Sequence, residues 1–397
     1  MQKSFLTGLL VSSSLIFTGC SKNSAKTADV SSTLLKPSLP SRLIIEDSNL
    51  DAVASEVNRD GGQVIRKMDH VKALVVSLPA PSLNGLKKKF PNAQISEDII
   101  MELVDPSVSL ASAKPTPGPG AQPTQSIPWG INATRANLAH AYNRGAGVKV
   151  CILDTGINKA HPDLKGNILG GKNYIMQKGS VLVDNYEDDN GHGSHVAGTI
   201  AALDNSIGAL GVAPDAKLYG VKVLNRQGSG YTSDIADGVY DCIGFGASVI
   251  NMSLGGSGDP LAPSPLKTAI ESALANGVYV VAAAGNSGKD ISTYTPAGYA
   301  GVIAVSAVDV NYAFASWSNF GLSIGDFAAP GVGIYSTWKD SGYNTISGTS
   351  MAAPHVAGVI ALAVSSHSLG IVARDLGATV SKQGSGFIDA LSTVLNQ

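Results

Sequence analysis

The sequence is poor in cysteine and in charge. It has only three cysteines, Cys20, Cys151 and Cys242, which excludes a disulfide-rich scaffold. Charged residues make up 15% of its 397 residues and the net charge is -2, so nucleic acid and anionic membranes are not expected as partners. Stability must come from a buried core, and 45 glycines fit a glycine-rich α/β fold. Cys151 and Cys242 lie in apolar surroundings, on a predicted strand and a predicted helix, and are expected to be buried free thiols, with a disulfide or a reactive role as the alternative.

The N-terminus has the pattern of an export signal. Lys3 is followed by an apolar run from Phe5 to Gly19 and then by Cys20. The run is shorter than the roughly 20 residues of a membrane-spanning helix, so residues 1–20 are predicted to be a signal peptide. The stretch SLIFTGC resembles a bacterial lipobox, although Phe17 stands where leucine is usual. It implies a lipid on Cys20, with ordinary signal cleavage nearby as the alternative.

Two folded domains are expected from the length and from the distribution of proline. Residues 21–41 are polar and are predicted to be a tether. Residues 42–104 alternate as strand, helix, strand, strand, helix, strand, with AQISEDIIMELV as one last strand, which predicts a small α+β domain of βαββαβ order. Residues 105–125 are rich in proline and are predicted to be an exposed, protease-accessible linker. Residues 126–397 form the second domain.

The second domain alternates apolar strands with helices. Predicted strands include VKVCIL, LYGVKVL, ASVINMSL, YVVAAAG and GVIAVSAV, and predicted helices include SHVAGTIAAL, DIADGVYDCIGFG, PLKTAIESALANG and SMAAPHVAGVIALAVSS. Strands that are apolar on both faces predict a parallel sheet with helices on both faces, an α/β fold. Ligands bind outside the carboxyl ends of the strands in such a sheet.

Three motifs carry the expected chemistry. Asp154 lies at a strand end in CILDTGI, His192 opens the helix of NGHGSHVAGT, and Ser350 opens the helix of SGTSMAAPHVAG. A serine hydroxyl needs an adjacent base to become a nucleophile, and the base needs an acceptor that fixes its tautomer. The zinc protease pattern needs histidines at i and i+4 with a glutamate between them. His192 and His195 stand at i and i+3 without one, so metal catalysis is excluded.

Together these motifs resemble the subtilase family, from about Gln125 to the last helices, and their chain order of Asp, His and Ser is the subtilisin order. The resemblance implies a subtilisin-like fold and a secreted serine endopeptidase that works through an acyl-enzyme. It makes His192 the base and leaves His195 as a packed helix residue. VVAAAGNSG resembles the oxyanion segment of the family, which assigns the side-chain amide of Asn286 and the backbone N–H of Ser350 to the oxyanion.

The resemblance also implies how a substrate binds. An extended peptide would pair with one backbone segment, and a second would line the pocket for the residue before the cleaved bond. These segments are Ser253, Leu254 and Gly255, and Ala283, Ala284 and Gly285. Small residues without an acidic group predict broad specificity with a preference for apolar side chains. The stretch after Asn286 departs from the subtilisin pattern and is closer to the proteinase K branch.

A structural calcium site is implied by the same resemblance. Its ligands would come from Gln125, Asp163, Leu203, Asn205, Ile207 and Ala209, which can supply the six to eight oxygens that Ca²⁺ prefers. The alternative is a loop held by internal hydrogen bonds alone. The acidic residues Asp184, Glu187, Asp188 and Asp189 are expected to form a solvated loop, with a second cation as the alternative.

Residues 42–104 resemble the propeptide domain that assists the folding of subtilases and then inhibits them. Self-cleavage is expected in the linker, so a lipid on Cys20 would anchor the propeptide at the bacterial membrane, and the mature enzyme would be released as a periplasmic or extracellular monomer. The partners expected are protein and peptide substrates and the propeptide itself. Two alternatives are an inactive subtilase fold used as a binding module and a dedicated maturation peptidase.

Overall fold

The computed structural model describes residues 41–103, 122–177, 180–181 and 183–397. Residues 39–397 form one compact unit. The predicted signal peptide, Cys20, the tether before residue 41 and most of the predicted linker lie outside the described residues.

The N-terminal domain, residues 41–103, begins as an antiparallel sheet with two helices. Its elements are β1 (Ser41–Glu46), α1 (Leu50–Arg59), β2 (Gln63–Met68), β3 (Ala73–Leu78), α2 (Leu83–Lys89) and β4 (Gln94–Glu97), with a short 3-10 turn at Ala80–Ser82. The strand order is β2-β3-β1-β4. Leu43 and Ile45 pack among the residues of α1 and α2, and Ile44 between them packs on the large domain. This alternation follows from the two-residue period of a strand.

The last strand of the predicted βαββαβ order is two strands, so the prediction of one continuous strand is wrong. β4 stays in the first sheet, whereas β5 (Ile100–Leu103) pairs with β11 (Ser229–Tyr231) and β13 (Leu254–Ser257) of the large domain. Asp98 lies at the break and accepts hydrogen bonds from Ser233 N (2.9 Å) and Ser233 Oγ (2.8 Å). Its carboxylate therefore binds the first turn of a helix at the point where the chain leaves one sheet and enters the other.

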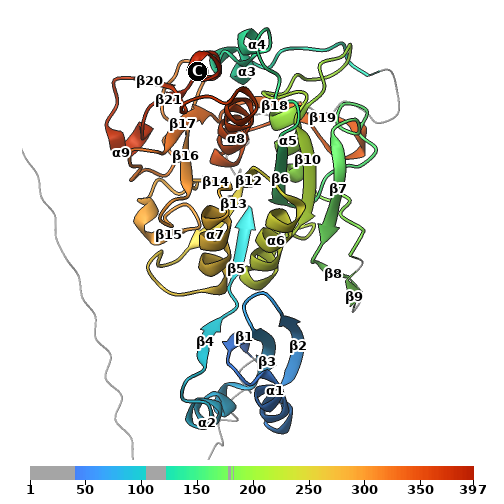
Figure 1. Cartoon of the computed structure of the whole chain (residues 1–397), viewed down its shortest axis with the longest axis vertical. Helices are drawn as coiled ribbons and strands as arrows, with labels where there is room; N and C mark the ends of the chain where they lie inside the picture. The colour runs from blue at the N-terminus through green and yellow to red at the C-terminus, as the bar shows by residue number, and fades with distance from the viewer. Residues whose placement is uncertain (1–40, 104–121, 178–179, 182) are drawn as a thin grey trace, which may run out of the picture. The chain divides into compact units, whose positions relative to one another are not determined.

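The large domain is built on the predicted parallel sheet (Figure 1). Its order is β20-β21-β17-β16-β14-β12-β6-β10-β7, and only the β20–β21 pair is antiparallel. The strands are β6 (Lys149–Asp154), β7 (Ile168–Asn173), β10 (Lys217–Lys222), β12 (Val249–Met252), β14 (Tyr279–Ala283), β16 (Ile303–Val308), β17 (Phe327–Pro330), β20 (Ala373–Arg374) and β21 (Phe387–Ile388). The five strands predicted from the sequence are therefore confirmed as β6, β10, β12, β14 and β16.

Two pairs of helices cover the sheet. Val150 and Ile152 of β6 pack with α5 (His192–Ala201) and α8 (Thr349–Ser366). Cys151 and Leu153 point to the other face, where α6 (Thr232–Phe245) and α7 (Pro265–Ala275) lie. In the described part of the chain, α8 alone has the length and hydropathy of a membrane span, and its burial marks it as an interior helix. The α/β fold with helices on both faces is thus confirmed.

Smaller elements complete the large domain. They are α3 (Trp129–Ala133), α4 (Ala136–Ala139), β8 (Met176–Gln177), β9 (Ser180–Val181), β15 (Tyr294–Thr295), β18 (Ile334–Thr337), β19 (Tyr343–Ile346), α9 (Val380–Gln383) and α10 (Ala390–Leu395), with 3-10 turns at Ile291–Thr293 and Lys339–Ser341.

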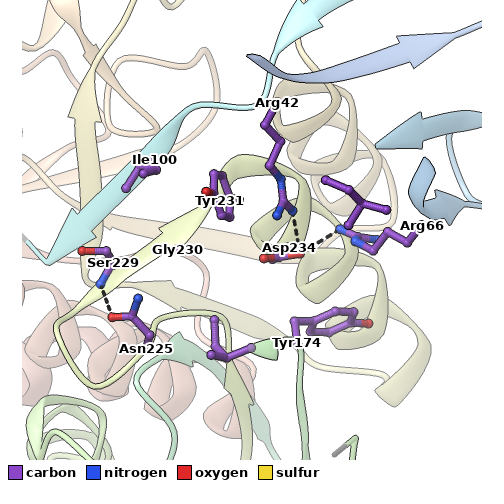
Figure 2. Close-up of a pocket in the computed structure, with 11 residues that line it drawn as sticks. Arg42, Arg66, Ile100, Tyr174, Asn225, Ser229, Gly230, Tyr231 and Asp234 are labelled. Carbon is purple, nitrogen blue, oxygen red and sulfur yellow. Dashed lines mark hydrogen bonds and ion pairs between the residues drawn. The ribbon is translucent and has the colours of Figure 1, made fainter. Parts of the chain in front are cut away.

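The N-terminal domain contacts α6 through charged as well as apolar groups. Figure 2 shows Arg42 and Arg66 of the N-terminal domain directed at Asp234 of α6. The nitrogen–oxygen distances are 3.8 Å from Arg42 and 3.0 Å from Arg66. Arg66 also pairs with Asp237, one turn further along the helix.

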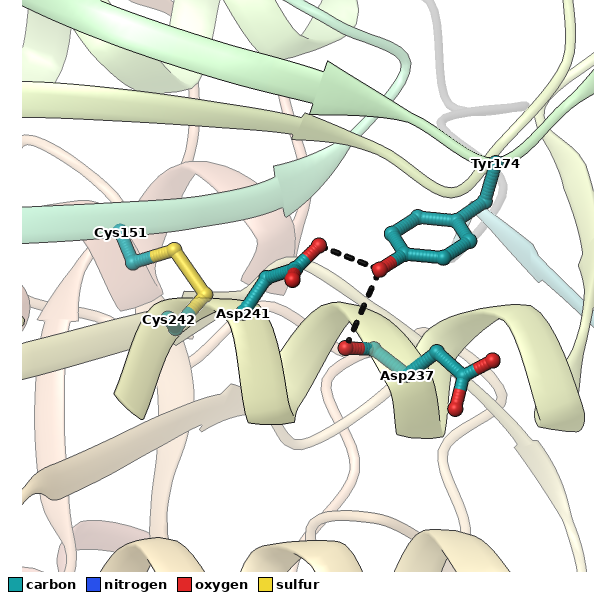
Figure 3. Close-up of a disulfide and its surroundings, with 5 residues drawn as sticks. All are labelled: Cys151, Tyr174, Asp237, Asp241 and Cys242. Atoms are coloured by element: carbon teal, nitrogen blue, oxygen red, sulfur yellow. Dashed lines mark hydrogen bonds between the residues drawn. A yellow bond between two sulfur atoms is a disulfide. The ribbon is translucent and has the colours of Figure 1, made fainter. Parts of the chain in front are cut away.

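The two cysteines of the large domain form a disulfide, so the prediction of free thiols is wrong. Cys151 of β6 and Cys242 of α6 have Cα atoms 5.7 Å apart, within the range that a disulfide spans (Figure 3). Both are fully buried, as the sequence indicated. Helix α6 lies on the face of the sheet to which Cys151 points, a proximity that 91 residues of sequence separation conceal. The bridge ties the strand of Asp154 to the helix that the N-terminal domain contacts.

Candidate active site

Asp154 and His192 form a buried hydrogen-bonded pair. His192 Nδ1 lies 2.8 Å from Asp154 Oδ1 and 3.0 Å from Oδ2. Asp154 is fully buried and His192 is 2% exposed. A carboxylate on Nδ1 holds the proton on that nitrogen, so Nε2 is left as the base. In the described residues Nε2 is buried without a hydrogen-bond partner.

The fold places the pair at the carboxyl edge of the sheet. Asp154 is the last residue of β6, which separates β10 and β7 on one side from β12 and β14 on the other. This is a topological switch point, where open α/β sheets bind ligands. His192 opens α5, and a Cβ at Gly193 would lie 2.1 Å from the carbonyl oxygen of Gly156. Glycine at position 193 therefore allows the helix to start directly against the turn that follows Asp154.

Ser350 lies in the first turn of α8 and is 1% exposed. Its hydroxyl donates to the carbonyl oxygen of Ser253 at 3.1 Å, and Ser253 Oγ donates to the Ser350 carbonyl at 2.8 Å. Ser350 is thus fixed beside the residue that precedes β13. Leu103 pairs with Leu254 of β13 and also lines a cavity of about 400 Å³ with His192. The end of β5 therefore lies next to both the serine segment and the histidine.

Asn286 is oriented by the start of α8. Its side-chain oxygen accepts from Thr349 N and from Thr349 Oγ1, both at 2.9 Å. Because the oxygen faces Thr349, the amide group of the side chain is its donor end. A Cβ built at Gly348, two residues before Ser350, would lie 3.2 Å from Asn286 Nδ2. The donor end is therefore close to the backbone that precedes Ser350.

His195 is a packed helix residue, as expected. It is fully buried, and its Nε2 lies 2.9 Å from the carbonyl oxygen of Ile334. Burial lowers the pKa of His195 to about 3, so its imidazole is neutral.

The predicted substrate-binding segments border the strand β5. Leu254 and Gly255 pair with Leu103 and Glu102 in antiparallel register. A Cβ on Gly255 would lie 2.6 Å from the ring of Tyr294, so the glycine permits close packing there. On the other side, Gly230 of β11 pairs with Met101. The sequence analysis missed this second edge, although two glycines in QGSGYTS before a helix were a signal for a backbone that another strand approaches.

The second predicted segment follows the end of β14. Ala283, Ala284 and Gly285 are buried. Gly285 N donates to Thr349 Oγ1 at 3.0 Å, and Gly285 has a φ of +111°, which favours glycine. This segment therefore adjoins the turn of α8 that holds Ser350.

The six predicted calcium-site residues lie together. Gln125 Nε2 donates to the carbonyl oxygens of Leu203 (2.9 Å) and Ala209 (3.5 Å), and Asn205 Nδ2 donates to Asp163 Oδ1 (2.8 Å). Ile207 N donates to Asn205 Oδ1 at 2.7 Å.

Burial raises the pKa of Asp163 to about 6 because the carboxylate loses solvent. Reversal of the Gln125 amide plane would turn its oxygen toward the carbonyl oxygens of Leu203 and Ala209, and reversal of the Asn205 amide would turn Oδ1 from Ile207 N toward Asp163. The donor set is then all oxygen, which fits Ca²⁺.

Asp188 is a residue beside the Asp154–His192 pair that the sequence analysis misplaced. It was expected in a solvated loop, but it is 5% exposed. Its Oδ1 accepts from Thr155 Oγ1 (2.8 Å) and Gly191 N (2.8 Å), and its Oδ2 accepts from Ser194 N (2.9 Å) and Ser194 Oγ (2.7 Å). One carboxylate thus ties the residue after Asp154 to the first turn of the His192 helix.

The neighbouring Asp189 has a different role. It is half-exposed and pairs with Lys222 Nζ at 2.6 Å, whereas Lys222 itself is 1% exposed. The ammonium also donates to the carbonyl oxygen of Thr155 at 2.6 Å. Lys222 aligns with Asp154 in the β10–β6 register, so a buried cation supports the loop beside the Asp154–His192 pair. No charge pattern in the sequence indicated this lysine.

Comparison with known proteins gives a family match and close relatives. A model of the subtilase family matches residues 145–380. The chain is 39% identical over 370 residues to Subtilisin NAT of Bacillus subtilis subsp. natto, and equally to Subtilisin E of Bacillus subtilis (strain 168). Each match covers 92% of this chain and 90% of the relative. These matches therefore include the N-terminal domain as well as the large domain.

A second group of relatives matches a shorter part of the chain at higher identity. M-protease of Shouchella clausii (strain KSM-K16) is 52% identical over 241 residues, which is 60% of each protein.

Proposed function

The chain belongs to the subtilase family and is a subtilisin-like secreted serine endopeptidase made as a precursor; on that premise we propose that Asp154, His192 and Ser350 are its catalytic triad. The observation that carries the proposal is the buried Asp154–His192 pair, with Nδ1 and Oδ1 2.8 Å apart. The pair leaves Nε2 as a base at the same end of β5 as Ser350. In this structure the Ser350 hydroxyl donates to the Ser253 carbonyl, and the proposal requires that it turns to donate to His192 Nε2 instead.

In the proposed reaction, His192 Nε2 takes the proton of Ser350 as Oγ attacks the scissile carbonyl carbon. The tetrahedral intermediate collapses when His192 returns the proton to the leaving amine, and an acyl-enzyme remains. A water then attacks the ester with His192 again as the base. The acid is released and the Ser350 hydroxyl is restored. Asp154 stays ionised throughout and stabilises the imidazolium.

Asn286 is proposed as a donor to the oxyanion. Thr349 fixes its side-chain oxygen, so the amide group is held toward the backbone near Ser350. The N-terminus of the 18-residue helix α8 adds positive potential at the same place. Preorganised donors stabilise negative charge that develops in the transition state, and the backbone N–H of Ser350 is the second proposed donor.

Substrates are proposed to bind as β5 does. A peptide would add between β11 and β13, with Ser253, Leu254 and Gly255 along one edge. Ala283, Ala284 and Gly285 would line the pocket before the cleaved bond and give a broad specificity with an apolar preference. β5 occupies these edges in the precursor, which supports the proposal that residues 42–104 inhibit the enzyme until the linker, residues 105–125, is cut. A lipid on Cys20 is proposed as an anchor of the precursor.

A fluorophosphonate probe tests the assignment of the nucleophile. We expect the probe to form a covalent adduct on Ser350 of the processed enzyme, because an activated hydroxyl attacks phosphorus as it attacks a carbonyl. Peptide mass spectrometry would locate the adduct, and heat-denatured enzyme serves as the control. An adduct on Ser253 or on another serine in place of Ser350 would disprove the assignment.

Calcium is proposed to bind at Gln125, Asp163, Leu203, Asn205, Ile207 and Ala209 and to stabilise the loop that they form. We expect removal of calcium by a chelator to lower the melting temperature by about 5–10 °C, since a ligand at 1,000 times its Kd contributes about 4 kcal/mol. Calorimetry of the full chain with Ser350→Ala avoids self-digestion. Asp163→Asn in the same background should melt at one temperature with and without calcium. Equal melting temperatures of the Ser350→Ala protein in calcium and in chelator would contradict the proposal.

A further inference from the structure

Helix α6 carries three carboxylates on one side. Asp234, Asp237 and Asp241 are spaced at i, i+3 and i+7, which places them on the same face of the helix. Asp241 pairs within the large domain, with Lys172 at 2.9 Å. The ion pairs of Asp234 and Asp237 in the described structure run instead to Arg42 and Arg66 of the N-terminal domain.

These carboxylates are nearly buried. Asp234 is 7% and Asp237 is 8% exposed, and burial raises the pKa of Asp234 to about 6 while Arg66 and Arg42 oppose that rise. Ionised carboxylates removed from water need cationic partners. Arg42 and Arg66 are these partners. Their side chains are 21% and 24% exposed, so the ion pairs are largely shielded from water.

Arg42 is held in place by further contacts within its own domain and with the large domain. Its Nε donates to Asp98 at 2.6 Å, and its guanidinium lies 3.6 Å from the centre of the Tyr231 ring. Asp98 in turn binds Ser233 N. Because Asp98 belongs to the N-terminal domain as Arg42 does, this pair orients the guanidinium before it meets Asp234, which lowers the entropic cost of the contact.

The remaining contact of the N-terminal domain with α6 and α7 is largely apolar. Ile44, Met68, Ala73 and Val75 pack into the same cluster as the inner faces of the two helices. An apolar surface binds many apolar partners. A buried charge instead discriminates between partners, because a partner without the complementary charge leaves it unpaired at a cost in free energy. A cavity of about 220 Å³ lies beside Arg42, Arg66, Tyr231 and Asp234 (Figure 2).

We propose that Arg42 and Arg66, bound to Asp234 and Asp237, are the contacts by which this protease selects its own propeptide domain and retains it after the linker is cut. The inference rests on the proposed inhibitory role of residues 42–104 and adds the determinant of partner choice. The partner that fits this surface is a domain that presents two guanidinium groups to α6 while its last strand lies between β11 and β13.

The test uses the full-length precursor with Arg66→Gln. Self-processing starts the experiment, and the lag before hydrolysis of a small fluorogenic peptide reports how long the cut domain stays bound. The variant is expected to shorten the lag about 30-fold or more, because truncation of one partner of a buried charge pair acts on dissociation at this scale. The final rate normalises the amount of enzyme. Lys67→Gln is the matched control, since Lys67 pairs only with the exposed Asp69 in the described structure, and its lag should equal that of the wild type.

A charge exchange separates recognition from folding. Arg66→Asp combined with Asp237→Arg restores an opposite pair across the interface and should recover at least tenfold of the lag lost in Arg66→Asp alone. If Arg66→Gln prevents folding, recovery in the exchanged variant supports the proposal and its absence overturns it. A lag of Arg66→Gln within twofold of the wild type also overturns it. Failure of the proposed function has a different result, a wild-type precursor that neither cuts its linker nor hydrolyses the peptide.

Discussion

Replacement of Ser350 by alanine is expected to leave the precursor uncut and to lower kcat for peptide hydrolysis by about 10⁶-fold, the loss found for the nucleophile of the relative subtilisin. The residue lies at the start of α8, with its backbone held by Ser253. Alanine removes the attacking oxygen but keeps the methylene that packs there. Folding should therefore be retained while the acyl-enzyme is lost.

Gel electrophoresis of the purified precursor and stopped assays with a chromogenic peptide measure the two effects of Ser350→Ala. Ser272→Ala on α7 is a matched control, since Ser272 is half-buried and its hydroxyl has no assigned role in the reaction. It should process and hydrolyse as the wild type does. Normal linker cleavage by purified Ser350→Ala protein, with no other protease present, would refute the assignment of the nucleophile.

Asp154→Asn is expected to reduce kcat by about 10⁴-fold with little change of fold, the size of effect seen when the triad carboxylate becomes an amide in a serine protease. Asp154 accepts from His192 Nδ1 and from Thr155 N at 2.7 Å. An amide can donate to Nδ1, which moves the imidazole proton to Nε2 and removes the base. The loss should appear in kcat, since substrate contacts are unchanged.

The effect of Asp154→Asn is measured as kcat and KM of enzyme matured by a trace of wild-type protease, which is then removed. Asp375→Asn is the control, because Asp375 is an exposed acid near the C-terminus. A decrease of less than tenfold in kcat would show that Asp154 does not set the tautomer of His192.

The sequence predicted most of the fold because the strands and helices of the large domain have strong local patterns. Helix α8 and strand β6 are examples, since each carries an uninterrupted run of apolar residues in its central part. The family and the endopeptidase function were also predicted correctly from the three motifs. These predictions depended on which residues stand within each motif and on the order of the motifs along the chain.

What the sequence did not predict depends on contacts between distant segments. The disulfide arises because α6 covers the face to which Cys151 points, and neither cysteine has a local signature. Asp98, at the break in the predicted strand, accepts from the N–H of Ser233, 135 residues later. Asp188 is buried where Thr155, Gly191 and Ser194 converge on it. Local patterns cannot reveal such partners.

The bridge between Cys151 and Cys242 closes a covalent ring that holds Asp154 and His192 but not Ser350. A protease in concentrated solution nicks its own loops, and Val183, 44% exposed, lies on a loop inside this ring. A single nick there opens the ring without detaching a fragment. The strand of Asp154 and the helix of His192 then stay covalently connected, and a nicked molecule can keep the arrangement of these two residues until the bridge is reduced.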